Sequence, residues 1–234
     1  MGKQRDTNSD FKVELSKQFF KGKSGEGEVL PSVKDALTKY FNAEGERYTG
    51  SQFESVINNA EPNSFTERDL IAVSLLNVDI PARAALWILS PEGQSQTSAL
   101  LKDIPVGIDL WHTDAANVFA DDGKLDRLWK LLGNANWPEA APGGGLGGTT
   151  KRSKLIAAKR PQLVPVLDRV VKGTLSQPEN YWRAFQEALS DNSFRMRLEE
   201  ATNVDGVPSN VCLLRRIDVV IWMNNHKRFR KPKK

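Results

Sequence analysis

The residues with the clearest chemical potential lie between residues 143 and 171, in the segment GGGLGGTTKRSKLIAAKRPQLVPVLDRVV. A cluster of glycines is followed by closely spaced lysines and arginines, and then by an apolar stretch that contains one acid, Asp168. Glycines allow a backbone to approach a phosphate closely, and cations neutralise phosphates. A carboxylate isolated among apolar residues is a candidate for catalysis. The pattern predicts a protein that binds nucleic acid and cleaves a bond in it.

The distribution of charge also favours an anionic partner. The chain holds 33 lysines and arginines against 29 acids, a formal net charge of +4. Its last eight residues carry six of the cations, and residues 150–172 carry seven more with a single acid. The remainder of the chain is therefore acidic, and two basic segments stand out from it. The alternative is that the tail only aids solubility and that the internal cations form a solvated helix face.

Several classes of site are excluded or disfavoured. The single cysteine, Cys212, rules out an intrachain disulfide, a cysteine-ligated iron–sulfur cluster and a multi-cysteine zinc site. His112 and His226 lie far apart and lack the spacing of metal ligands. We expect no metal and no cofactor. No apolar run reaches the length of a membrane span, and the N-terminus lacks the hydrophobic core of a signal peptide, so we expect a cytoplasmic protein, monomeric and without a membrane partner.

Helix signals are frequent along the chain, and the alternation typical of strands is scarce. Capping pairs occur at Ser32 with Asp35, at Ser51 with Glu54 and at Thr66 with Asp69. Further helices are predicted after Pro81, over 124–133, over 149–159, after Pro178, over 193–201 and over 210–226. The fold class predicted is mostly α. We expect a polar, loosely ordered segment over 1–28, a helical domain of one or two lobes over 29–226, and a basic tail over 227–234.

The glycine loop, defined here as residues 143–148, joins two of these predicted helices. A turn of this type points backbone N–H groups outward and binds a DNA phosphate without reading the base sequence. Pro161 and Pro165 interrupt the chain after the next helix, which places Asp168 in or just before a further helix. The residues predicted to contact DNA are Gly145, Gly147, Gly148, Thr149, Thr150, Lys151, Arg152, Lys159 and Arg160.

These residues resemble the helix-hairpin-helix DNA glycosylase superfamily. Its members carry a hairpin of Leu-x-Gly-x-Gly type, a helix that often bears a catalytic lysine, a Gly/Pro-rich connection and a catalytic aspartate. Leu146 and Gly147 correspond to the hairpin, Lys151 or Lys154 to the lysine, and Asp168 to the aspartate. The resemblance implies a helical glycosylase-like fold and double-stranded DNA as the partner.

The resemblance also implies a mechanism. The target base is flipped out of the stack, and the N-glycosidic bond is broken with positive charge developing on the sugar. Asp168 would stabilise that charge and orient a water, while Lys154 is the candidate for direct attack on the sugar through a Schiff base. The lysine spacing departs from that of the superfamily, which favours a monofunctional, hydrolytic glycosylase. Such an enzyme would act in repair or in defence against phages with modified DNA.

A second resemblance covers more of the chain. The stretches YTGSQFE, FTERDLIAVSLLNVDIP and LLRRIDVVIWM are similar to an uncharacterised, largely actinobacterial family. That resemblance implies no activity. Two further functions therefore stay open: a non-catalytic DNA-binding module on the same helical scaffold, and an interaction protein whose basic tail binds RNA or an acidic partner.

Individual residues also have structural interpretations. Asp168 could form an ion pair with Arg152, Arg160 or Arg169 and take no part in catalysis. Trp111 and Trp137 lie near predicted loops, where an aromatic ring could stack on a flipped base or wedge into the duplex, although core packing is the commoner role of tryptophan. An enzyme requires Asp168 to face a pocket, whereas the interaction protein predicts that Asp168 is buried in a salt bridge.

Overall fold

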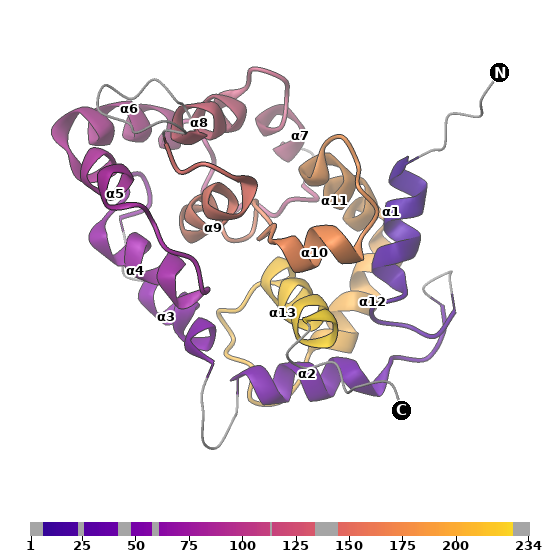
Figure 1. Cartoon of the computed structure of the whole chain (residues 1–234). Helices are drawn as coiled ribbons and strands as arrows, with labels where there is room; N and C mark the ends of the chain where they lie inside the picture. Colours follow the sequence, from indigo (N-terminus) through magenta and orange to yellow (C-terminus); the bar gives the residue numbers. More distant parts are fainter. Residues whose placement is uncertain are drawn as a thin grey trace. The chain divides into compact units, whose positions relative to one another are not determined.

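The computed structural model describes residues 7–22, 26–41, 48–57, 61–112, 114–133 and 145–226. Its secondary structure is helical almost throughout (Figure 1), which confirms the mostly-α fold class. The one strand-like pairing between described residues is an isolated antiparallel bridge from Phe20 to Val29. Ser32 lies inside the helix Pro31–Phe41 and Ser51 inside the 3-10 helix Thr49–Gln52, so neither serine is the N-cap that its capping pair predicts.

The chain divides into two compact units. Unit 1 combines residues 1–47 with residues 168–234, and unit 2 is the continuous stretch Tyr48–Leu167. The boundary falls between Leu167 and Asp168, inside the segment that the sequence singles out. The glycine loop and its basic helix therefore belong to unit 2, whereas Asp168 is the first residue of the second part of unit 1.

Unit 1 is a set of helices drawn from both ends of the chain. Its members are α1 (Thr7–Ser16), α2 (Pro31–Phe41), α10 (Arg169–Thr174), α11 (Tyr181–Ser190), α12 (Asn192–Thr202) and α13 (Leu213–Asn225). The apolar helix α13 packs against α2, α10 and α12, and α1 packs against α11. Most of α13 is buried because apolar residues lie on nearly all of its faces, as expected of a central helix.

Helix α1 corrects the prediction of a loosely ordered segment over 1–28. Phe11 and Leu15 are fully buried, and the Phe11 ring meets the Phe185 ring edge-on at 4.9 Å between centroids. Lys12 Nζ donates to Asp191 Oδ2 at 2.6 Å. The polar composition of the segment conceals an apolar spacing: Phe11 and Leu15 lie on one face of α1, and Phe19, in the turn after the helix, is also fully buried.

The Lys12–Asp191 pair gives unit 1 a dependence on pH. Hydrogen bonds from Lys12, Ser193 and the Phe194 N–H hold the pKa of Asp191 well below its usual range. A carboxyl with a lowered pKa in the folded state contributes stability above its unfolded pKa, about 3.9, and this contribution is lost as the pH falls through the folded value.

We expect Asp191→Asn to lower the free energy of unfolding at neutral pH by less than about 1 kcal/mol, because the pair is partly exposed and screened. Asparagine keeps the cap to Phe194 but loses the charge. The difference from wild type should shrink as the pH falls toward about 2, which urea unfolding at several pH values measures. A difference that grows in acid would contradict this assignment.

The described residues of unit 2 form a short 3-10 helix and seven α-helices. They are η1 (Thr49–Gln52), α3 (Phe53–Ile57), α4 (Glu67–Leu75), α5 (Ala82–Leu89), α6 (Pro91–Leu101), α7 (Ala115–Val118), α8 (Lys124–Gly133) and α9 (Thr149–Lys159). The capping pair predicted before α4 is confirmed, since the Thr66 N–H donates to Asp69 Oδ2 at 2.7 Å. Helix α9 has the bounds predicted from the sequence.

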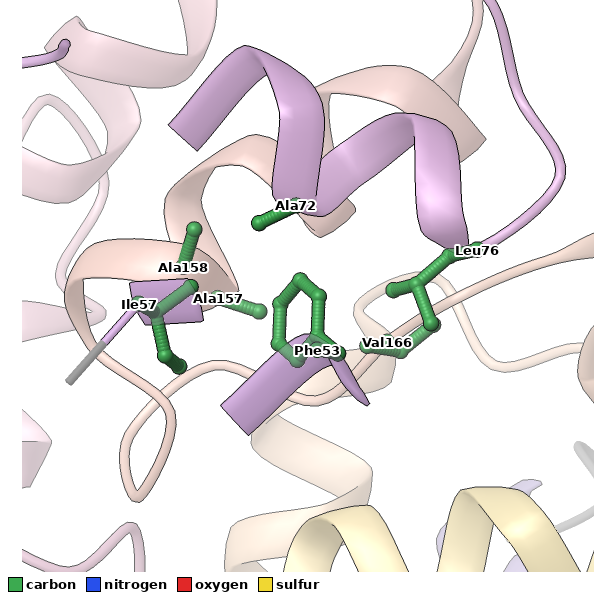
Figure 2. Close-up of a cluster of buried hydrophobic side chains, with 7 residues drawn as sticks. All are labelled: Phe53, Ile57, Ala72, Leu76, Ala157, Ala158 and Val166. Carbon is green, nitrogen blue, oxygen red and sulfur yellow. The ribbon is translucent and has the colours of Figure 1, made fainter. Parts of the chain in front are cut away.

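Helix α9 lies against α3, α4 and α8, and residues 153–159 are all buried. Figure 2 shows the Phe53 ring beside Ala157, with Ala72 of α4 above the ring and Leu76 and Val166 on the side away from Ala157. The small side chains of α9 let its neighbours approach closely. The whole cluster is Phe53, Ile57, Ala72, Leu76, Ala157, Ala158 and Val166. Burial of this helix decides which of its cations can reach a ligand.

Candidate nucleic-acid interface

The described part of the glycine loop, Gly145–Gly148, leads directly into α9. Leu146 is 1 % exposed, and its N–H donates to the Leu132 carbonyl at the end of α8 at 2.8 Å. Gly145 and Gly147 have φ values of 73° and 68°, in the left-handed region where a side chain is strained. The loop is therefore fixed at a buried leucine while glycines carry the chain through its sharp turns.

The backbone around the start of α9 is open. A Cβ atom built on Gly147 or Gly148 would meet no atom within 4 Å. Gly148 is the N-cap of α9 and supplies no side-chain cap. The first turn of any α-helix has N–H groups without intrahelical partners, so the amides of Thr149, Thr150 and Lys151 are placed to receive an anion.

The side chain of Arg152, in the first half of α9, packs against helix α8. Its guanidinium stacks on the Trp129 ring, 4.3 Å from the centroid, and Nη1 donates to the Trp129 carbonyl at 3.2 Å. Burial lowers the pKa of this guanidinium. A Cβ at Gly133 would clash with the Arg152 side chain, so glycine at the end of α8 makes room for it. Arg152 thus joins α9 to α8, in addition to any contact with phosphate. Lys151, the preceding residue, is half-buried and keeps part of its side chain in solvent.

Lys159 requires a correction, because it is buried rather than presented to DNA. Its side chain is 1 % exposed, and Nζ lies 2.5 Å from Asp69 Oδ2. Nζ also donates to the Glu61 carbonyl at 2.7 Å. Desolvation lowers the pKa of this lysine. The Lys159–Asp69 pair therefore fastens the end of α9 to the start of α4, and leaves no donor facing solvent.

Arg160 requires the same correction. It is 2 % exposed, and burial lowers its pKa to about 10. Its donors reach carbonyl or amide oxygens of Pro62, Asn63, Leu101 and Ile104 at 2.6–2.9 Å. Pro62 and Asn63 lie in the loop before α4, while Leu101 ends α6 and Ile104 follows it. One guanidinium therefore pairs with loop and helix-end oxygens that lack partners within a helix. The predicted phosphate contact is replaced by a structural role.

Lys154, the candidate nucleophile, also lies inside unit 2. It is 5 % exposed, and Nζ donates to the Leu76 carbonyl at the end of α4 at 2.8 Å. A lysine that attacks a sugar must reach the substrate with an unprotonated amine. Lys154 instead caps the C-terminal end of α4 from inside the fold, where a substrate does not reach it. The structure therefore corrects the assignment of Lys154 as a nucleophile and gives its ammonium group a structural role.

Asp168 is the N-cap of α10, as its predicted place at the start of a helix requires. Oδ1 accepts a hydrogen bond from the Val171 N–H at 2.9 Å, and the residue is 8 % exposed. Within the described ranges, no ion pair links Asp168 to Arg152, Arg160 or Arg169. The interpretation of Asp168 as one half of a salt bridge is therefore not supported by the described residues.

The other predicted positions are less informative. Trp111 is half-buried between α6 and α7, and its stacking on a base stays a prediction. Trp137, residues 143–144 of the glycine loop and the basic tail 227–234 lie outside the described residues. No group of three His, Cys, Asp or Glu side chains in the described part of the chain could hold a metal ion.

Sequence reasoning missed Ser153, which is fully buried on α9 and accepts a hydrogen bond from the Leu167 N–H at 3.1 Å. In the sequence, Ser153 stands between Arg152 and Lys154, a pattern that predicts a solvent-exposed helix face. Only the burial of α9, which depends on distant helices, gives the hydroxyl its partner.

Comparison with known proteins adds a family without an assigned activity. None of the helices in the described ranges is long and apolar enough to cross a membrane. No curated protein matches the chain, and no solved structure matches it either. Residues 33–225 match a family of unknown function, DUF6308. This match covers most of the chain, which therefore belongs to the DUF6308 family.

Proposed function

We propose that the chain binds double-stranded DNA at the glycine loop and hydrolyses the N-glycosidic bond of a modified base. The observation that carries the proposal is the open backbone at Gly147 and Gly148, which leads straight into the first turn of α9. Twenty residues after Gly148, the chain supplies a carboxylate at a helix start, Asp168. The same order of parts characterises the helix-hairpin-helix glycosylases that the sequence resembles.

The loop is suited to a phosphate because it offers amides without side chains in the way. Gly145 and Gly147 adopt left-handed backbone conformations, which make the turn tight. The buried side chain of Leu146 anchors the loop to the core of unit 2. Lys151 adds a cation in the first turn of α9. Contacts of this kind fix a protein on the duplex without reading its sequence.

Asp168 is the carboxylate proposed to act on the sugar. As the glycosidic bond breaks, positive charge develops on the sugar ring, and a nearby carboxylate stabilises that charge and orients the attacking water. Hydrolysis consumes one water and yields the free base and an abasic site. Because Lys154 is committed to the Leu76 carbonyl, we propose a monofunctional enzyme without lyase activity.

One observation favours the second candidate, a DNA-binding module without catalysis. Asp168 already has a structural task as the cap of α10. Incubation of the protein with several genomic DNAs, including hypermodified phage DNA, separates the two candidates. The enzyme creates abasic sites in at least one DNA, whereas the module binds all of them and creates none.

We expect the affinity for DNA to fall steeply with salt, because each neutralised phosphate contributes about −0.9 to the slope of log K against log salt. Lys151→Gln should make that slope shallower by about one unit. Lys102→Gln, an equal change at an exposed lysine beside α6, is the control and should leave the slope unchanged. Fluorescence anisotropy over a salt series measures both. Equal slopes for all three proteins would contradict a phosphate contact at Lys151.

A further inference from the structure

The hydroxyl of Ser153 lies between the first turn of α9 and the residue before Asp168. Ser153 is fully buried. Its Oγ accepts a hydrogen bond from the Leu167 N–H at 3.1 Å and lies 3.5 Å from the Leu167 carbonyl oxygen. Its own hydrogen is directed to the Thr150 carbonyl at 3.1 Å. One side chain thus joins the first turn of α9 to a backbone segment fourteen residues beyond Ser153.

The contacts of Ser153 matter because Thr150 and Leu167 each lie next to a part of the proposed site. Thr150 belongs to the turn of α9 that we propose to hold a phosphate. Leu167 is 2 % exposed, is joined by a peptide bond to Asp168, and ends the proline-punctuated stretch that follows Arg160. Two prolines in that stretch, Pro161 and Pro165, have no N–H to donate, so its backbone offers few hydrogen bonds of its own.

We infer that Ser153 is a positioning residue for Asp168. By holding the Leu167 backbone against α9, it fixes the point at which the chain leaves unit 2 and enters the cap of α10. The inference rests on the proposed function, since it takes Asp168 as the carboxylate that acts on the sugar. Misplacing a catalytic group by about 1 Å can cost on the order of 10²-fold in rate, so loss of the Ser153 contact to Leu167 should affect chemistry far more than binding.

A purely structural serine makes a different prediction. It would stabilise unit 2 as any buried hydroxyl does and leave the Asp168 cap as it is. Thr97 supplies the comparison: it is fully buried in α6, and its Oγ1 donates to the Gly93 carbonyl at 2.7 Å. Ser153→Ala and Thr97→Val each remove one buried hydroxyl from unit 2, but only the first touches Leu167.

The experiment measures amide hydrogen exchange and base release for wild type, Ser153→Ala and Thr97→Val as full-length chains. In Ser153→Ala we expect exchange at the Leu167 amide to accelerate by roughly 10–100-fold, as for the loss of one buried hydrogen bond. Exchange at the Val171 amide, which reports the Asp168 cap, should accelerate with it. Single-turnover base release at saturating DNA should fall by about 10–100-fold while the dissociation constant for DNA stays unchanged. Thr97→Val should alter none of these values.

The outcomes separate this inference from the proposed function. If the Val171 amide exchanges as in wild type in Ser153→Ala, Ser153 does not position Asp168 and the inference is overturned, whatever the activity. The same holds if base release continues at the wild-type rate. If wild type releases no base from any DNA, the proposed function fails, and a selective acceleration at Val171 still upholds the role of Ser153 in placing the carboxylate.

Discussion

Asp168→Asn is expected to lower the rate of base release by about 10²–10³-fold while DNA binding persists. Asparagine keeps the shape of the side chain and an oxygen that can accept the Val171 N–H, so α10 should stay capped. What is lost is the negative charge that stabilises the developing positive charge on the sugar. Single-turnover assays on a DNA that wild type attacks, together with anisotropy measurements of binding, test this expectation.

Asp191→Asn provides a matched control for that variant. Asp191 caps α12 in the same unit and accepts the Phe194 N–H at 3.1 Å, so the two substitutions make the same chemical change at two helix starts. We expect Asp191→Asn to release base at the wild-type rate. A folded Asp168→Asn protein with full activity would exclude Asp168 as the catalytic carboxylate. Failure of Asp168→Asn to fold would assign the residue to structure alone.

Arg160→Ala is expected to destabilise the protein by about 3–5 kcal/mol, the range typical of truncating a large, fully buried side chain to alanine. The substitution leaves the carbonyls of Leu101, Ile104 and Pro62 without their donor in a buried site. It also leaves a void where a large side chain was fully enclosed. Urea unfolding monitored by circular dichroism measures the loss.

Arg127→Ala is the corresponding surface control. Arg127 pairs with Asp122 at 3.0 Å, but its side chain is 52 % exposed, so its removal should cost no more than about 1 kcal/mol. The comparison also tests the correction made for Arg160. If Arg160→Ala were as stable as Arg127→Ala but bound DNA more weakly, the arginine would be a phosphate contact after all.

The elements that could be predicted from the sequence are those whose signals are local. The capping pair before α4 lies within four residues, and α9 is bounded by Gly148 on one side and Pro161 on the other. The position of Asp168 at a helix start followed from two prolines upstream. Each of these inferences needed only near neighbours in the chain, where capping and backbone restriction act.

The parts that could not be predicted depend on partners far away in the chain. Lys159 and Arg160 look like two more cations of a basic segment, and the oxygens that bury them come from residues 61–63, 69 and 101–104. Net charge per segment does not show which face of a helix will be covered. Ser153 was missed for the same reason. Helix α1 was missed because the average composition of 1–28 outweighed its apolar spacing.

The division of the chain into units has a consequence for its synthesis. Every residue of unit 2 is synthesised before helices α11–α13, which are the partners of α1 and α2. Translation proceeds at roughly 5–20 residues per second, whereas local helical contacts form far faster. Unit 2 can therefore complete its core during synthesis. Over the same period the apolar side chains of Phe11, Leu15 and Leu37 stay exposed, because the helices that cover them have not yet folded. Until α11–α13 emerge, the apolar faces of α1 and α2 are thus the parts of unit 1 most open to aggregation and proteolysis.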